Sequence, residues 1–179
     1  MPPMEALMHW AVGSYGTPLD SLMVLSAEYA VFLSFVVLAF LWFSRDREAV
    51  ALAMYTGVLG VMLSYAAGMF YSHQGPYTVL DTLLSDPAGE NTFPSQHTAL
   101  AFSLALGLVK RRPTYGYILV LFAVLTGFGR FYTGLHWPID ILGALLVSGI
   151  AYLVVNLFEE PLMAFTRPFI ELYEKYSPV

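Results

Sequence analysis

Long apolar stretches alternate with short polar segments along almost the whole of this chain. Four of the stretches reach or approach the ~20 residues with which a helix crosses a bilayer. Inside lipid the backbone polar groups must be satisfied within the segment itself, so each of these stretches predicts a helix. The four predicted spans are Ser21–Phe43, Ala49–Tyr71, Thr114–Phe131 and Trp137–Phe158.

A fifth, shorter apolar stretch runs from His97 to Val109, and it qualifies as a span if its first turn includes Ser95. Of the 179 residues, 58% are hydrophobic and 12% are charged, which is far too apolar for a soluble domain of this size. We therefore predict an all-α integral membrane protein. The bundle has about five transmembrane helices plus short interfacial helices, in a single domain over residues 1–179.

The basic residues predict the orientation, because Lys and Arg of short loops are retained on the cytoplasmic side. Seven of the eight lie between the first two spans, between the third and fourth, or after the fifth. The N-terminal segment and the loop Ser72–Pro94 carry acidic residues but no Lys or Arg. We therefore expect the N-terminus outside and the C-terminus in the cytoplasm. The seven residues are Arg45, Arg47, Lys110, Arg111, Arg112, Arg167 and Lys175.

Three segments outside the spans have the apolar spacing of helices that lie on a membrane surface. They are residues 4–11, 78–84 and Pro161–Tyr176, and Pro168 is expected to kink or break the last of them. At the start of the first span, Asp20 is expected to cap the free amides of the first turn. We expect no cleavable signal peptide, because the N-terminal segment lacks a basic n-region. The chain has no cysteine, which excludes disulfides and thiolate metal sites.

Two short motifs at the outer ends of the predicted spans contain the candidate chemistry. Pro94-Ser95-Gln96-His97 opens the third span, while Arg130 is followed by His136 and Asp140 around the start of the fifth. Pro94 and Pro138 favour helix N-termini at these two places. The free amides and positive dipole end of each helix make a favourable place for phosphate.

These residue types supply the parts of a phosphoryl-transfer site. A neutral His136 imidazole can attack phosphorus if its other ring nitrogen donates to Asp140. A protonated His97 can give its proton to the leaving oxygen. The forked guanidinium of Arg130 can bind two equatorial oxygens through the transition state.

Weaker candidates surround these four residues. Ser95 and the backbone amides of Gln96 and His97 can complete the phosphate cradle. Glu28, in the outer half of the first span, is either a structural carboxyl group or a supporting group near Arg130 or the substrate. No carboxylates or histidines at metal-ligand spacing lie near the motifs, so we expect no metal or other cofactor. Nothing in the charge pattern suggests nucleic acid.

At the two motifs the chain resembles the type 2 phosphatidic acid phosphatase superfamily, whose second motif is Pro-Ser-x-His and whose third is Arg-x5-His-x3-Asp. The resemblance implies a metal-independent phosphatase for lipid phosphates or diphosphates, with His136 as nucleophile and His97 as acid. Within the superfamily the chain is most similar to the bacitracin-resistance type of undecaprenyl diphosphate phosphatase. This similarity extends over residues 19–23, 27–30 and 125–130.

The chain departs from the family at its first motif, which carries a lysine and then Arg-Pro shortly before the second motif. Gly75 stands where the arginine is expected, and the lysine position, near Gly68, also lacks a base. A hydrogen bond to a charged group is worth about 1.5 to 3 kcal/mol, so each missing cation corresponds to about 10- to 100-fold in binding or rate. The available substitutes are His73, Gln74, Tyr71 and Tyr77, and among them we predict that His73 and Gln74 bind phosphate.

The sequence thus predicts a lipid phosphatase that hydrolyses a polyprenyl (undecaprenyl-type) diphosphate to the monophosphate through a phosphohistidine, on the outer face of the plasma membrane. The expected partners are this lipid and the surrounding membrane lipids. One alternative is a phosphatase for phosphatidic acid or phosphatidylglycerophosphate, because the motifs do not read the lipid tail. The other is a non-catalytic binder of lipid phosphates that has lost the first-motif cations.

Overall fold

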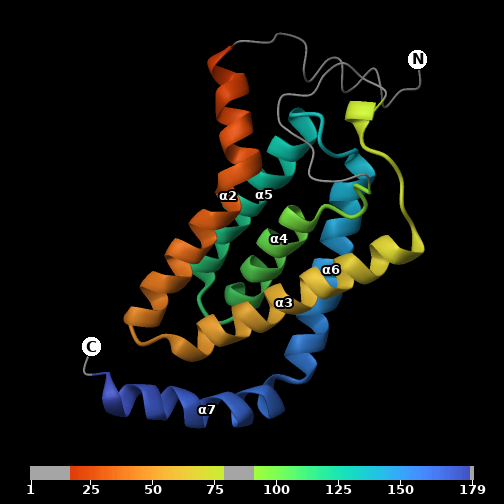
Figure 1. Cartoon of the computed structure of the whole chain (residues 1–179). Coiled ribbons are helices and arrows are strands. Elements are labelled where there is room, and N and C mark those ends of the chain that lie inside the picture. The colour runs from red at the N-terminus through yellow and green to blue at the C-terminus, as the bar shows by residue number, and fades with distance from the viewer. Residues whose placement is uncertain (1–16, 79–90, 178–179) are drawn as a thin grey trace.

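The computed structural model describes residues 17–78 and 91–177, and within these ranges the regular structure is entirely helical. The helices form an elongated bundle, with a last helix lying across one end (Figure 1). This architecture confirms the predicted all-α fold. The helices are α2 (Pro18–Phe43), α3 (Arg47–Phe70), the 3-10 helix η1 (Pro76–Thr78), α4 (Gln96–Val109), α5 (Pro113–Tyr132), α6 (Pro138–Leu157) and α7 (Glu159–Tyr176).

Four of these helices, α2, α3, α5 and α6, are long and apolar enough to cross a membrane, so the chain is a multi-pass membrane protein. They correspond to the four long apolar stretches of the sequence. The predicted surface helix at residues 4–11, and all but Thr78 of the one at residues 78–84, lie outside the described residues. The predicted C-terminal surface helix is α7.

Helix α2 begins three residues before the predicted start of its span, because a capping box closes its first turn. Thr17 is the N-cap: its side-chain oxygen accepts from the Asp20 amide, and the Asp20 carboxylate accepts from the Thr17 amide at 2.7 Å. Asp20 therefore acts at the third helical position and not as the cap itself. The same carboxylate accepts from the Tyr132 hydroxyl at 2.9 Å, which joins the start of α2 to the end of α5.

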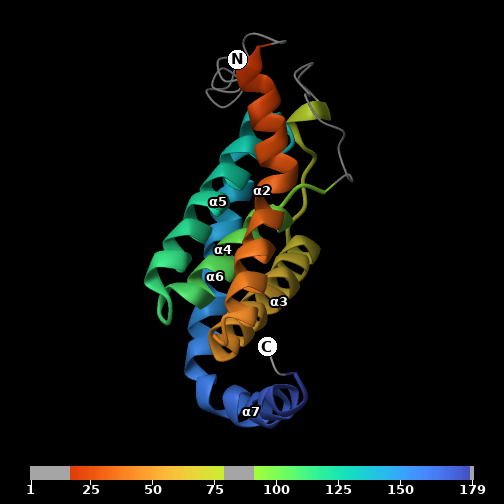
Figure 2. The ribbon, with the colours of Figure 1, turned by 90° about the vertical axis from the view of Figure 1, so that its left-hand side faces the viewer.

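Helix α4 occupies the middle of the bundle and contacts α2, α3, α5 and α6 (Figures 1 and 2). Small side chains allow this central position, since Ala99, Ala101 and Ala105 are completely buried. The helix has 14 residues, and Ser95 is its N-cap and not part of its first turn. At 1.5 Å per residue it is about 21 Å long, shorter than the ~30 Å hydrocarbon core. The count of five spans therefore remains a prediction.

Seven basic residues predicted to share one side of the membrane do lie at one end of the bundle, where the α2–α3 turn, the α4–α5 turn and α7 meet. Arg112 pairs with Asp46, and Arg111 pairs with Glu159. Arg167 Nε lies 2.8 Å from Glu48. These pairs hold α7 across the bundle end and bring both short turns to the same level.

Arg47 is the buried centre of this charged end. Its side chain is 1% exposed, and its Nη1 lies 2.6 Å from Glu174 of α7. The guanidinium also lies over the rings of Trp42 and Tyr173, at 5.8 and 5.0 Å from their centroids. Helix α7 is continuous through Pro168, so a break at this residue is wrong, while the kink stays a prediction. The pairs Arg167–Glu48 and Arg47–Glu174, before and after the proline, hold the helix in place despite the one lost backbone hydrogen bond.

Gly129 allows α5 to approach α2 closely, next to Arg130. A Cβ atom at this position would lie 2.6 Å from the Ala27 nitrogen and 2.9 Å from the Met23 oxygen. Both are backbone atoms of α2, which cannot move without shifting the helix. The absence of a side chain at Gly129 therefore sets how near the Arg130 backbone lies to α2.

We expect Gly129→Ala to destabilise the protein by about 1 to 3 kcal/mol, because it overpacks a helix contact that cannot relax. The melting temperature of the purified protein in detergent measures this effect. Gly149→Ala is the matched control, since nothing lies within 4 Å of a Cβ atom there. That variant is expected to be unchanged or more stable, because Ala favours a helix by about 1 kcal/mol over Gly. Equal melting temperatures for both variants would contradict the close-approach explanation.

Candidate functional site

A cavity of about 340 Å³ lies at the end of the bundle opposite the charged turns, and it brings the two sequence motifs together. Its wall is built from the C-terminal part of α3, residues 91–94, the first turn of α4, and the end of α5 with the following turn. His97, Arg130 and His136 all line it, as does Gln96. A larger cavity of about 590 Å³ lies at the charged end and is lined by none of the motif residues.

His136 is held on this wall by the short connection between α5 and α6. Its backbone amide donates to the Arg130 carbonyl at 3.2 Å, which ties the histidine to the last turn of α5. The side chain is 10% exposed, and its Nδ1 lies 3.3 Å from Asp140 Oδ2. Burial lowers the pKa of the His136 imidazole, against the opposing effect of the Asp140 carboxylate. The neutral form therefore persists to lower pH than for a solvated histidine.

Asp140 is completely buried and serves as a polar hub behind His136. It is the third residue of α6, and its Oδ2 accepts from the Trp137 amide at 2.9 Å, as in a capping box. Its carbonyl accepts from the Ser95 amide at 3.2 Å, which joins the start of α6 to the start of α4. Helix capping thus fixes the carboxylate that orients His136.

Arg130 reaches the cavity from the last turn of α5. The residue is 7% exposed, and its Nη1 donates to the Ala27 carbonyl of α2 at 3.1 Å. Its Nε is buried without a hydrogen-bond partner in the structure. One side of the guanidinium is therefore anchored to α2, while donors remain for a bound anion. Among the described residues lining the cavity, Arg130 is the only Lys or Arg.

Glu28 lies on α2, next to the residue that accepts from Arg130. It is half-buried and close enough to Arg130 for electrostatic attraction. Glu28 does not line the cavity itself. The supporting role of Glu28 near Arg130 therefore stays a prediction.

Ser95 differs from its neighbours in the second motif. Gln96 and His97 line the cavity, but the Ser95 side chain is completely buried, and its hydroxyl shares a 2.9 Å hydrogen bond with Thr98. Its position gives no support to the expected role in a phosphate cradle. The second motif therefore offers one histidine to the cavity and uses its serine to organise the start of α4.

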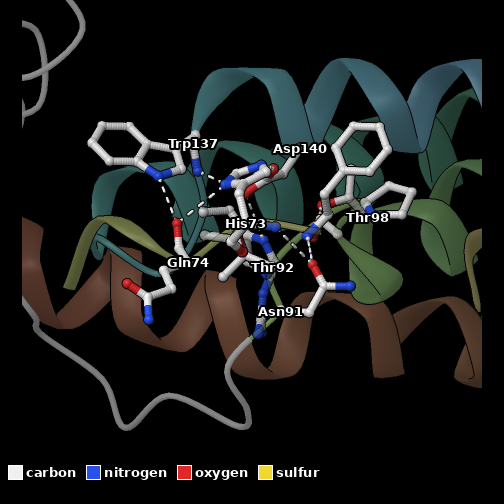
Figure 3. A network of polar contacts seen from close by, with 12 residues as sticks. His73, Gln74, Asn91, Thr92, Thr98, Trp137 and Asp140 are labelled. Atoms are coloured by element: carbon white, nitrogen blue, oxygen red, sulfur yellow. Dashed lines mark hydrogen bonds and ion pairs between the residues drawn. The ribbon is translucent and has the colours of Figure 1, made fainter. Parts of the chain in front are cut away.

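His73 and Gln74, predicted as substitutes for the missing cations, do not line the cavity. His73 turns to the far side of Asp140, with Nε2 at 2.8 Å from Oδ1 (Figure 3). The side chain of Gln74 is exposed. The backbone carbonyl of Gln74 accepts from the Trp137 indole Nε1 at 3.0 Å. The segment containing both residues thus packs against the start of α6, behind the site.

The two glycines at the missing first-motif positions are closed off by residues 91–93 and Tyr77. A Cβ atom on Gly68 would lie 2.9 Å from the Phe93 carbonyl oxygen, and one on Gly75 would clash with the Tyr77 ring. Asn91 bridges this region, donating to the Gly68 carbonyl at 3.1 Å and accepting from the Phe93 amide at 3.0 Å. A lysine or arginine side chain at either glycine would therefore require these neighbouring residues to shift.

Tyr77, one of the available substitutes for the missing cations, lines the cavity. Asn91 and Thr92 line it as well, and the sequence analysis missed both as site residues. No spacing or motif signal marks these two residues. Within the described ranges, no group of three His, Asp or Glu residues can hold a metal ion.

The fold and this cavity define a membrane-embedded helical protein with a histidine- and arginine-lined site. The model of the PAP2 superfamily matches residues 49–163, and the chain belongs to this superfamily, which confirms the resemblance seen in the two motifs. It is similar to the undecaprenyl-diphosphatase BcrC of Bacillus subtilis (strain 168), with 32% identity over 165 residues, covering 89% of this chain and 85% of that protein.

Two crystal structures share the fold. Aquifex aeolicus LpxE matches with a TM-score of 0.68 and 25% identity, covering 83% of this chain and 92% of LpxE. The transmembrane PAP2-type phosphatidylglycerolphosphate phosphatase of Bacillus subtilis matches with a TM-score of 0.68 and 22% identity, covering 88% of this chain and 84% of that one.

Proposed function

We propose that this chain is a lipid phosphatase that hydrolyses a polyprenyl diphosphate of the undecaprenyl type to the monophosphate. One observation carries the proposal: a buried His136–Asp140 pair opens onto the same cavity as His97 and Arg130. This set provides a nucleophile, its orienting carboxylate, an acid and a phosphate clamp. The similarity to the undecaprenyl-diphosphatase BcrC supports the choice of lipid.

The proposed first step transfers the terminal phosphoryl group to His136. Because Nδ1 faces Asp140, Nε2 is the nitrogen that attacks phosphorus, and the P–N bond forms as the bridging P–O bond breaks. His97 gives its proton to the departing lipid-phosphate oxygen. Asp140 stabilises the positive charge that develops on His136, and Arg130 binds the equatorial oxygens.

In the second step water completes the hydrolysis. The neutral His97 left by the first step takes a proton from water, whose oxygen attacks phosphorus and breaks the P–N bond. Inorganic phosphate leaves, His136 returns to its neutral form, and His97 is protonated again. All four residues thus act in both halves of the reaction.

The proposed location is the plasma membrane, with the site facing outward. The cavity and the cluster of basic residues lie at opposite ends of the bundle, and Lys and Arg favour the cytoplasmic side. A reagent that cannot cross the membrane, applied to cysteines introduced singly at Ser72 and Ser44, tests this. If the Ser44→Cys variant is labelled in intact cells and the Ser72→Cys variant is not, the orientation is the opposite of the proposed one.

We expect purified protein to release phosphate from undecaprenyl diphosphate at the same rate with and without EDTA, because the proposed steps use only protein side chains. Phosphate release measures this directly, with magnesium added back as the control. A strict requirement for a divalent ion, restored by adding the ion, would contradict the mechanism.

The same assay separates the alternatives when the lipid is varied. Faster release from phosphatidic acid or phosphatidylglycerophosphate would favour a phospholipid phosphatase. Binding of undecaprenyl diphosphate without release of phosphate from any of the three lipids would indicate a non-catalytic binder.

A further inference from the structure

The carboxylate of Asp140 lies between two histidines, only one of which belongs to a family motif. His136 Nδ1 is 3.3 Å from Oδ2, and His73 Nε2 is 2.8 Å from Oδ1. Figure 3 shows His73 reaching Asp140 from the segment that follows α3. The Oδ1 atom is buried and has no hydrogen bond of good geometry, so its close partner is the His73 ring.

The atoms around His73 determine how many protons its ring carries. Nδ1 lies 3.1 Å from the Gln74 carbonyl oxygen, which can only accept, so this nitrogen carries a proton. Nε2 lies 2.8 Å from Asp140 Oδ1, which is within ion-pair distance, although neither atom makes a hydrogen bond of good geometry. A buried carboxylate is stabilised by an opposite charge, which an imidazolium at the position of His73 would supply.

His73 lies between the two positions at which the first motif of the family carries cations. The two first-motif cations are replaced by Gly68 and Gly75, and His73 is the only basic residue between them. It does not line the cavity, so it is not placed to bind the phosphate directly. The titratable groups around it are Asp140, with His136 beyond, and Tyr71 of its own segment, whose ring centroid is 5.4 Å away. The Phe93 ring, at 6.1 Å, covers another side.

We infer that His73 is a positioning residue for the reaction: as an imidazolium it holds Asp140 ionised and directs its second oxygen to the nucleophile His136. The inference rests on the proposed function, since it gives His73 a role in the same phosphoryl transfer. It replaces the expectation that His73 binds phosphate. The positive charge lost from the first motif thus acts on the carboxylate behind the nucleophile.

Two substitutions separate the charge of His73 from its shape. His73→Ala removes the cation and is expected to lower kcat about 10- to 100-fold with little change in KM, because the phosphate contacts remain. His73→Lys keeps a cation and is expected to recover most of kcat. Ser72→Ala, an exposed neighbour, is the control and should match the wild type.

The pH dependence of kcat/KM is expected to shift in a direction that a purely structural role for His73 does not predict. Without the cation, Asp140 attracts the His136 proton more strongly, so the pKa of His136 rises and the acid limb of kcat/KM moves to higher pH in His73→Ala. In His73→Lys the acid limb should stay at or below that of the wild type. If His73→Ala does not fold, the kcat of His73→Lys and the acid limb of its kcat/KM profile, both compared with the wild type, still test whether the charge of His73 is needed.

Three results would overturn the inference. An unchanged kcat in folded His73→Ala removes His73 from the reaction. A raised KM with unchanged kcat makes it a phosphate ligand. A loss of kcat that His73→Lys does not recover, with the acid limb unmoved, makes it structural. His136→Ala is assayed alongside, because activity in that variant would overturn the proposed function itself.

Discussion

Replacing His136 with alanine is expected to lower phosphate release at least about 1,000-fold, because it removes the attacking nitrogen, and His73, the other histidine beside Asp140, does not line the cavity. The loss should appear in kcat, since Arg130 and His97 still line the cavity and bind the lipid phosphate. Rates of phosphate release at saturating undecaprenyl diphosphate measure it. Acid-labile phosphate should be trapped on the wild-type chain during turnover and be absent from the variant.

The control for this substitution is Ile139→Ala, which removes side-chain atoms from a 42% exposed residue in the first turn of α6, close to His136 in the chain. We expect that variant to keep wild-type kinetics. Wild-type phosphate release by folded His136→Ala would show that another group attacks phosphorus.

Replacing Arg130 with lysine is expected to lower kcat/KM about 100-fold or more, even though the charge is kept. A lysine ammonium lacks the planar fork that binds two phosphate oxygens, and one or two charge-assisted hydrogen bonds are worth about 1.5 to 3 kcal/mol each. The effect is expected to be large here because Arg130 is the only Lys or Arg among the described cavity residues. Arg130→Ala should lower kcat/KM further.

Inhibition by inorganic phosphate separates binding from chemistry in these variants, because weaker inhibition shows that the clamp itself is lost. Arg45→Lys, an exposed arginine at the opposite end of the bundle, is the matched control and should leave the kinetics unchanged. Wild-type kcat/KM in Arg130→Lys would mean that charge alone suffices at this position.

Local signals in the sequence were sufficient for the main helices and for the end of the bundle at which the motifs lie. Pro138 predicts the helix start that places Asp140 in its first turn, and the four-residue spacing then brings Asp140 back to His136. The contact of Arg130 with Ala27 is different, since it joins residues 103 apart. Only the packing of α5 on α2 creates that contact, and Gly129 is its one visible trace in the sequence.

The contacts of residues 71–78 and 91–95 show which features of the site could not be read from the sequence. His73 and Asp140 are brought together by the fold of a loop, and no periodicity predicts such a contact. Ser95 belongs to the second motif but packs inward on Thr98, because the start of α4 is pulled toward α6 by the Ser95 amide and the Asp140 carbonyl. Asn91 has no motif at all, and its role appears only when Gly68 and Phe93 lie on either side of it.

The shortness of α4 sets the depth at which chemistry takes place. Its C-terminal end is level with the charged turns, because Arg111 and Arg112 pair with Glu48 and Asp46. If the charged turns lie at one edge of a ~30 Å hydrocarbon layer and α4 stands upright in it, a length of about 21 Å leaves the His97 end about 9 Å short of the other edge. We therefore expect the diphosphate group of the substrate to descend below the headgroup plane to react. The two products would then leave by different routes, inorganic phosphate outward to water and the lipid monophosphate sideways among the membrane lipids.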